Sequence, residues 1–340
     1  MKTSSLLALT LCGLASQCAH AQVPPKRPLC RAYTDMSVPI TQPGTYCLRS
    51  SLTGPGIKIQ ADDVILDLKG YSVRSDKPAP EAPGGDWWNS IGIFNANNHN
   101  VTVRNGTVIG YAVGVYLGYD QLTPGSGYTI ENLLVRNSTM IGITVASAPN
   151  GAANTVVRNN IVSDTVGRAP TGISVGGTNG TLVVENNRVD NTRGIVSDLD
   201  PQTYPELQAR GILVSAATVA TISGNVITNT TAADDVGKAA GLYVNICTAC
   251  GPVPAVNIDG NYILNAEAAA NSTGIYLWAG IPTPSGTPWV NVSTSRVYRF
   301  RKGIDAATLP GVVGATSNVV SGSLTPYSSS LALLSGNRVE

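Results

Sequence analysis

Charged residues are scarce in this chain of 340 residues: they make up 13% of it, and the formal net charge is +1. This balance gives no basic face for nucleic acid and no acidic tail. Long apolar runs are absent after residue 14, and the one earlier run, Leu6 to Leu14, is too short to span a bilayer. Leucine, lysine and glutamate do not recur at helical spacing, which argues against a helical fold.

The first residues have the pattern of a secretory signal. The basic residue Lys2 precedes the apolar run, and Ala19-His20-Ala21 matches an A-x-A cleavage site. We therefore expect residues 1–21 to be removed, together with Cys12 and Cys18, and the mature protein to be secreted or periplasmic.

Four cysteines lie beyond this segment, and exported cysteines usually form disulfides. Closeness in sequence favours the pairs Cys30–Cys47 and Cys247–Cys250 among the three possible pairings. The Cys-x-x-Cys spacing of the second pair is also that of redox motifs. Such motifs need a strand-to-helix setting, whereas this one lies among prolines and glycine, which favours a structural loop disulfide.

One short phrase recurs at a fixed interval along the chain. Its asparagines, Asn105, Asn132, Asn159 and Asn186, are each 27 residues apart, and looser copies follow near positions 224, 260 and 294. A fixed period of this length predicts a stacked solenoid. Asparagine suits a tight left-handed turn, and its amide can bond to the same amide one repeat away.

A second phrase, a Gly-Ile strand, appears between these copies, for example at Gly142-Ile143-Thr144-Val145. Each repeat then holds a Gly-Ile strand, a strand ending at the Asn turn, and a third short strand. We predict an all-β, single-stranded parallel β-helix with three strands per coil and about eight to nine coils. Its expected parts are an N-terminal cap at 22–56, the β-helix at 57–325 and a C-terminal tail at 326–340.

These phrases make residues 40 to 325 resemble the bacterial right-handed parallel β-helix proteins of the pectate-lyase-like group. The resemblance, together with the right-handed rule for parallel crossovers, implies a right-handed coil. It also implies that the Gly-Ile sheet forms the floor of a substrate groove. Inserted segments fall on either side of that strand, which favours loops walling such a groove.

Strict alternation predicts which side chains point outward from the Gly-Ile sheet. Aromatic rings over a groove suit sugar rings, while amides and hydroxyls suit sugar hydroxyl groups. The alternative is that these rings pack beneath the loops. The predicted substrate-binding residues are Tyr116, Tyr243, Tyr276, Trp278 and Asn245.

Acidic and basic residues on two consecutive inserted segments are the catalytic candidates: Asp234, Asp235, Lys238 and Arg210. Paired carboxylates can hydrolyse a glycosidic bond. Alternatively, Lys238 or Arg210 could abstract a proton from a uronic acid while aspartates hold Ca²⁺. Charges on surface loops are usually only solvated, which is the competing interpretation.

The resemblance implies no particular enzyme, because the motifs of polygalacturonases, mannuronan epimerases and pectin esterases are missing apart from one Asp-Asp pair. Two hypotheses follow. The protein acts on a polysaccharide as a lyase or hydrolase, or it is a non-catalytic module that binds a glycan or another partner. In either case we expect a monomer without a membrane span.

Overall fold

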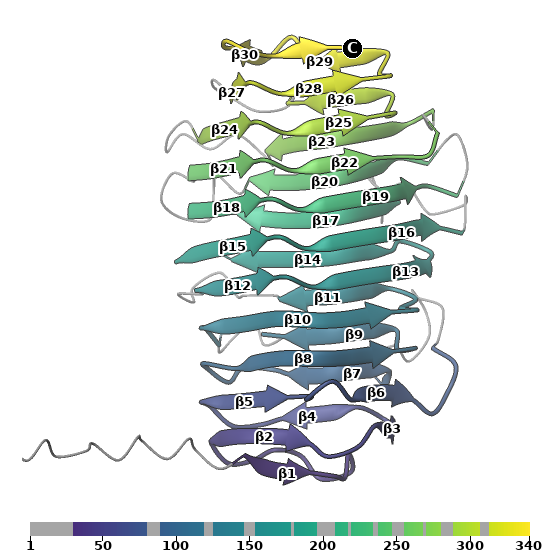
Figure 1. The fold of residues 1–340 in the computed structure, drawn as a ribbon, viewed down its shortest axis with the longest axis vertical. Helices are drawn as coiled ribbons and strands as arrows, with labels where there is room; N and C mark the ends of the chain where they lie inside the picture. The colour runs from purple at the N-terminus through teal and green to yellow at the C-terminus, as the bar shows by residue number, and fades with distance from the viewer. Residues whose placement is uncertain are drawn as a thin grey trace, which may run out of the picture.

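In the computed structural model, the chain winds into one column of stacked coils, from β1 (Arg31–Tyr33) at one end to the C-terminus beside β29 (Thr325–Tyr327) at the other (Figure 1). The structure describes residues 30–79, 89–118, 125–145, 154–177, 180–195, 208–216, 219–233, 237–246, 255–267, 270–279, 288–306 and 313–340. The named elements in these ranges are all β-strands. No helix within them has the length and apolar character needed to cross a bilayer.

Ten parallel strands, one from each coil, form the sheet that contains the Gly-Ile phrase, here called sheet B. Its strands in stacking order are β4 (Ile57–Ile59), β7 (Ile91–Asn95), β9 (Val113–Leu117), β11 (Ile141–Val145), β14 (Thr171–Gly177), β17 (Ala209–Ala216), β20 (Ala239–Ile246), β23 (Ser272–Ala279), β26 (Lys302–Asp305) and β29 (Thr325–Tyr327). The two end strands, β4 and β29, lack the glycine of the phrase.

The other strands form sheet A, which has two columns joined at the Asn turn. Before the turn lie β2 (Gly44–Leu48), β5 (Val64–Asp67), β12 (Thr155–Arg158), β15 (Thr181–Glu185), β18 (Val219–Ser223), β21 (Ala255–Asp259), β24 (Trp289–Ser293), β27 (Val313–Thr316) and β30 (Leu331–Leu333). After it lie β3 (Leu52–Gly54), β6 (Ser72–Ser75), β13 (Ile161–Gly167), β16 (Arg188–Gly194), β19 (Val226–Thr231), β22 (Tyr262–Leu264), β25 (Arg296–Tyr298), β28 (Val319–Ser321) and β31 (Arg338–Val339). Two longer strands, β8 (Thr102–Ile109) and β10 (Tyr128–Arg136), run through the turn and belong to both columns. The predicted parallel β-helix with three strands per coil is confirmed, whereas sheet B has ten strands, more than the eight to nine coils predicted.

The ends of the column continue the same parallel pairing. β1 (Arg31–Tyr33) pairs with β2, and a disulfide between Cys30 and Cys47 links these two strands. This disulfide is the predicted N-terminal pair. Cys247 and Cys250 lie outside the described residues. At the other end, β30 and β31 pair in parallel with β27 and β28.

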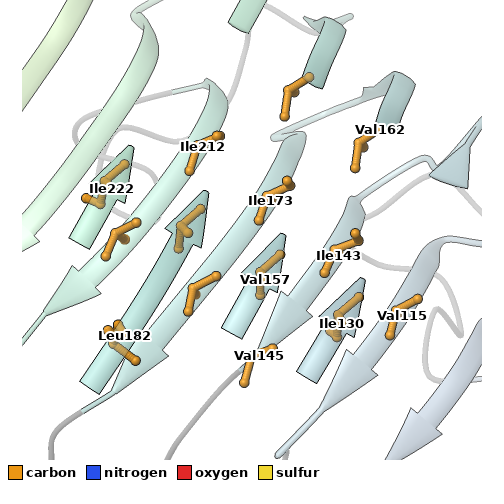
Figure 2. Close-up of a cluster of buried hydrophobic side chains, with 14 of the residues drawn as sticks. Val115, Ile130, Ile143, Val145, Val157, Val162, Ile173, Leu182, Ile212 and Ile222 are labelled. Atoms are coloured by element: carbon orange, nitrogen blue, oxygen red, sulfur yellow. The ribbon is translucent and has the colours of Figure 1, made fainter. Parts of the chain in front are cut away.

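The core is a stack of Val, Ile and Leu side chains that point inward from all three columns (Figure 2). Ile143 and Ile173 of sheet B, for example, have no exposed surface, and neither do Ile130 and Val157 of sheet A. Each coil buries its apolar side chains against the coils above and below, so the hydrophobic stabilisation is shared along the column.

The glycine of the Gly-Ile phrase is required because there is no room for a side chain at its position. At Gly172, a Cβ atom would lie 2.6 Å from the carbonyl oxygen of Gly211 in the next coil and would overlap the Cγ1 methyl of Val189. The same arrangement recurs at Gly114, Gly142 and Gly211. The missing side chain therefore lets sheet A pack directly on the backbone of sheet B.

The repeated asparagines occupy the left-handed turn that the sequence predicts. Asn105, Asn132, Asn159 and Asn186 have φ angles of 58°, 55°, 55° and 54°. Asn132 also donates to the side-chain oxygen of Asn105 at 3.4 Å. The long amide ladder, however, is formed by the residue that follows each repeated turn residue. These following residues make a second column, which sequence reasoning missed.

This buried ladder runs through Asn160, Asn187, Asn225 and Asn261, each at most 1% exposed. The side-chain oxygen of Asn187 accepts from both the backbone and the side-chain nitrogen of Asn160, at 3.0 Å each. Asn225 and Asn261 repeat this pattern in the next two coils. Each amide also donates to a buried carbonyl, such as Ile130 O from Asn160 at 3.0 Å. The ladder therefore satisfies polar groups at the turn that would otherwise be buried without partners.

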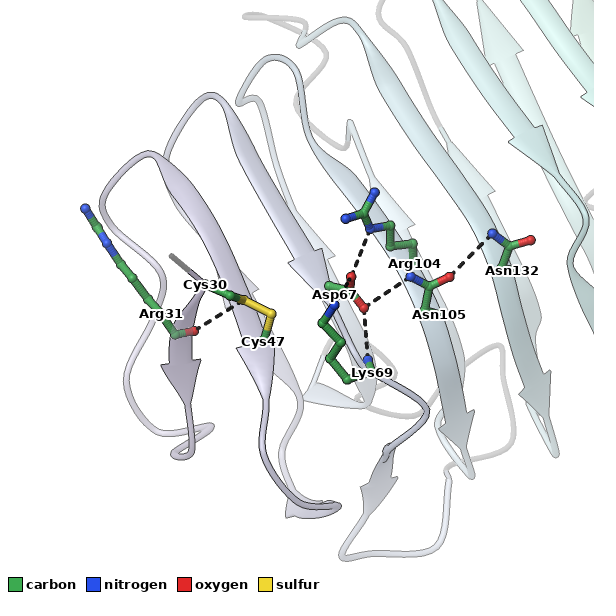
Figure 3. Close-up of polar contacts among 8 residues, drawn as sticks. All are labelled: Cys30, Arg31, Cys47, Asp67, Lys69, Arg104, Asn105 and Asn132. Carbon is green, nitrogen blue, oxygen red and sulfur yellow. Dashed lines mark hydrogen bonds and ion pairs between the residues drawn. A yellow bond between two sulfur atoms is a disulfide. The ribbon is translucent and has the colours of Figure 1, made fainter. Parts of the chain in front are cut away.

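On the outer side of sheet A, Asp67 links several groups at the first turn (Figure 3). Its carboxylate is 1% exposed and accepts from the Lys69 backbone nitrogen at 3.0 Å, from Asn105 at 3.2 Å and from Arg104 at 3.1 Å. The Lys69 ammonium lies 3.2 Å away. Burial by itself would raise the pKa of the Asp67 carboxyl, but the hydrogen bonds from Lys69 and Asn105 and the charge of Lys69 outweigh it and lower the pKa.

This lowered pKa predicts an acid-sensitive contribution to stability. A carboxyl whose pKa is lower in the folded than in the unfolded chain stabilises the fold at pH values above its unfolded-state pKa of about 3.9. This stabilisation is lost as the pH falls through the folded-state pKa. We expect Asp67→Asn to lower the urea midpoint of unfolding at pH 7. The difference between the midpoints of the variant and the wild type should narrow below about pH 4. Glu267→Gln, which removes an exposed carboxylate at the far end, controls for lost charge. A difference in urea midpoint that does not change with pH would contradict the prediction.

Candidate functional site

The outer face of sheet B carries a straight row of side chains, one from each of the nine strands from β4 to β26. The strand register aligns them in adjacent strands, and alternation turns them away from the core. In stacking order the row is Lys58, Phe94, Tyr116, Thr144, Ser174, Leu213, Tyr243, Tyr276 and Asp305. A second row beside it contains Ser215, Asn245 and Trp278. All five predicted substrate-binding residues therefore lie on one face.

Two aromatic pairs form within the first row. Phe94 and Tyr116 meet edge to face, with ring centroids 6.1 Å apart. Tyr243 and Tyr276 stack with centroids 5.4 Å apart and an interplanar angle of 17°. Leu213 and Trp278 pack against the second pair, which makes a small apolar cluster outside the main core.

Exposure differs within this cluster in a way that alternation could not predict. Tyr276, Trp278 and Asn245 are partly exposed, but Tyr243 keeps only 5% of its surface open. The expectation of an exposed Tyr243 ring is therefore wrong. The ring lies between Tyr276 and the guanidinium of Arg210, which is 5.9 Å from its centroid. Tyr243 supports its neighbours and presents little surface of its own.

The predicted catalytic residues are only partly described. Arg210 lies in β17, and Lys238 directly precedes β20, so they come from consecutive coils as expected. Lys238 is exposed, and its carbonyl accepts from Gln208 N at 2.8 Å. Asp234 and Asp235 lie outside the described residues. A catalytic role for these four residues stays a prediction.

A hollow of about 370 Å³ continues this face at β26 and β29. It is lined by Lys302, Ile304, Asp305, Thr325, Tyr327, Ser328 and Ser329. The Lys302 ammonium lies 2.7 Å from Oδ2 of Asp305. Sequence reasoning missed this pair, because strict alternation puts residues three apart in a strand on opposite faces.

The gaps between the described ranges have a common position in the sequence. Each gap lies directly before or after a strand of sheet B, for example 196–207 before β17 and 280–287 after β23. Several of these gaps coincide with the inserted segments in the sequence. Among the described residues, no three His, Cys, Asp or Glu side chains gather as a metal site. The proposed Ca²⁺ stays a prediction, because the two aspartates invoked for it are outside this set.

Fold and face together define a class of protein: a parallel β-helix with aromatic, amide and charged side chains along the outside of one sheet. The chain belongs to the right-handed β-helix family, because the family described as "right handed beta helix region" matches residues 89–282, more than half of the sequence. This match agrees with the right-handed coil that the resemblance implied.

Two solved structures are similar to this chain. One is the A-module of mannuronan C-5 epimerase AlgE6 from Azotobacter vinelandii, with 14% identity and a TM-score of 0.43, covering 88% of this chain and 89% of that one. The other is the Dettilon tailspike protein, with 13% identity and a TM-score of 0.41, covering 86% of this chain and 59% of that one. Similarity at this level is no guide to activity. No curated protein matches the sequence.

Proposed function

We propose that the protein binds a polysaccharide along the outer face of sheet B, with Tyr276 and Trp278 as the stacking surface. The observation that carries this proposal is the Tyr243–Tyr276 stack with Trp278 packed beside it, on the outside of a sheet. Large aromatic side chains are usually placed in the core, so a cluster of three on an outer face needs a reason.

The chemistry of the cluster fits a sugar chain. Sugar rings present C–H surfaces that stack on aromatic faces, and their hydroxyl groups need polar partners nearby. Asn245 lies in register with Trp278 one coil away and is partly exposed. The rigid stack beneath Tyr276 holds its ring in place, which lowers the entropy lost on binding.

The test compares the wild type with a Tyr276→Ala/Trp278→Ala double variant in affinity electrophoresis against neutral and uronate-containing polysaccharides. We expect the variant to bind at least about tenfold more weakly, because tenfold corresponds to about 1.4 kcal/mol, within the range of two lost stacking contacts. Trp289→Ala is the matched control, since Trp289 is 58% exposed on sheet A. Equal affinity of the double variant and wild type would refute the proposal.

Catalysis on the bound polysaccharide is a second candidate function. It is favoured by the position of Arg210 over the Tyr243 ring and of Lys238 on the next coil, beside the proposed stacking surface. Together with Asp234 and Asp235, they would supply the acid and base groups of a lyase or hydrolase, with or without Ca²⁺. New ultraviolet absorbance of an unsaturated product indicates a lyase, and new reducing ends alone indicate a hydrolase. If neither appears with any bound polymer, the protein is a non-catalytic binding module.

The proposed location is outside the cytoplasm. The Cys30–Cys47 disulfide supports it, because disulfides persist in oxidising compartments. The secretory signal expected at residues 1–21 is consistent with this location, although these residues lie outside the described ranges.

A further inference from the structure

The hollow at β26 and β29 contains an ion pair between Lys302 and Asp305. The Asp305 carboxylate is 3% exposed, while the Lys302 side chain is about half exposed, and the two groups are 2.7 Å apart. An ammonium group has three N–H donors, and this contact uses one of them. The buried carboxylate therefore restrains the lysine, which lines the hollow and keeps two donors for other partners.

Two hydroxyl groups beside this pair are available to a ligand. Ser328 is occupied, since its Oγ accepts from Ala306 N at 2.9 Å and lies 3.0 Å from the Ser330 hydroxyl. Those contacts fix the turn that closes the hollow. Thr325 and Ser329 are exposed, and their hydroxyls make no hydrogen bond to any residue that the structure describes.

The hollow directly continues the proposed stacking surface. Tyr276 and Asp305 are register partners in adjacent strands, and neighbouring strands are about 4.8 Å apart. This spacing is comparable with the length of one pyranose unit in an extended glycan. A sugar chain that lies on Tyr276 and runs along the coil axis therefore places its next units over the hollow.

We propose that this hollow is a polar subsite for one or two further sugar units of the same chain. It binds their hydroxyl groups through Lys302, Thr325 and Ser329, whereas the neighbouring Tyr276 and Trp278 bind by stacking. The volume of about 370 Å³ is in the lower part of the range of small-molecule sites. This inference rests on the proposed polysaccharide binding and extends its footprint toward the C-terminal coils.

The test uses hexasaccharides and disaccharides of cellulose, mannan, polygalacturonate and alginate, with affinities measured by calorimetry on the full chain. The variant is Thr325→Val/Ser329→Ala, which removes both hydroxyls from exposed positions and leaves the Lys302–Asp305 pair intact. Thr316→Val/Ser335→Ala, at the far side of the same coils on sheet A, is the matched control.

We expect the hollow variant to bind the recognised hexasaccharide about tenfold more weakly than the wild type, as two lost hydrogen bonds would give. Most of the difference in affinity between the hexasaccharide and the disaccharide should be lost in this variant. The control should bind as wild type does. If the Tyr276→Ala/Trp278→Ala variant loses affinity but the hollow variant keeps it, the subsite is refuted and polysaccharide binding stands. If the wild type binds none of the four hexasaccharides, both proposals are overturned.

Discussion

Replacing Gly172 by alanine is expected to lower the free energy of unfolding by about 3 kcal/mol, the upper end of the usual cost of overpacking a core. The added methyl would meet the Gly211 carbonyl oxygen at 2.6 Å and the Thr192 hydroxyl at 3.1 Å, and it would overlap Val189. All three neighbours lie in other strands, and two of them, Val189 and Thr192, belong to β16 of sheet A, so relief requires sheets A and B to separate locally. Urea denaturation of the purified variant measures the change.

The control for this substitution is in the same strand. Among the residues that the structure describes, a Cβ atom at Gly176 would have no neighbour closer than 3.8 Å, and Gly176 is not among the positive-φ glycines. Gly176→Ala should be neutral or stabilising by up to about 1 kcal/mol, because alanine restricts the unfolded chain. If both variants lose stability equally, the glycine phrase reflects strand flexibility and the packing explanation is wrong.

Asn160→Ala is expected to lower the free energy of unfolding by about 3–5 kcal/mol, since several buried groups lose their partners at about 1–3 kcal/mol each. The Leu133 backbone nitrogen would lose its acceptor, at 3.0 Å in wild type, and the Ile130 carbonyl would lose a donor. The side-chain oxygen of Asn187 would lose one of its two donors from Asn160. Thermal and urea unfolding at neutral pH check the value.

The adjacent residue provides the comparison. Asn159 is exposed and has a φ of 55°, a conformation that glycine adopts without strain. Asn159→Gly should change stability by less than about 1 kcal/mol, the usual limit for exposed positions. A larger loss at Asn159 than at Asn160 would show that the turn conformation, and not the buried ladder, holds the coils together.

Much of the fold could be predicted because the repeat is local and regular. The interval between Asn105, Asn132, Asn159 and Asn186 gave the coil length, and the left-handed turn followed from the residue type. The Gly-Ile phrase gave the strands of sheet B and, through alternation, the side chains on its outer face. The sequence distance between Cys30 and Cys47 favoured the disulfide that the structure contains.

The candidate site was less predictable, because exposure depends on neighbours from other coils. Alternation placed Tyr243 outward correctly, but its low exposure depends on neighbours from other coils, which include Tyr276 and Arg210. Lys302 was missed because its role depends on an ion pair with Asp305, three residues further along the same strand. The buried ladder was missed because Asn160 and Asn187 look like ordinary neighbours of the repeated asparagines.

The sequence by itself determined the path of the backbone. A repeated local pattern places each strand above its equivalent in the previous coil, because the same residues form the same turns each time. Only the tertiary structure decided which polar groups are buried, paired or open to a ligand. Partners such as Asp67 and Asn105, 38 residues apart, meet across a coil boundary, and the strength of their interaction depends on how far neighbouring coils exclude water.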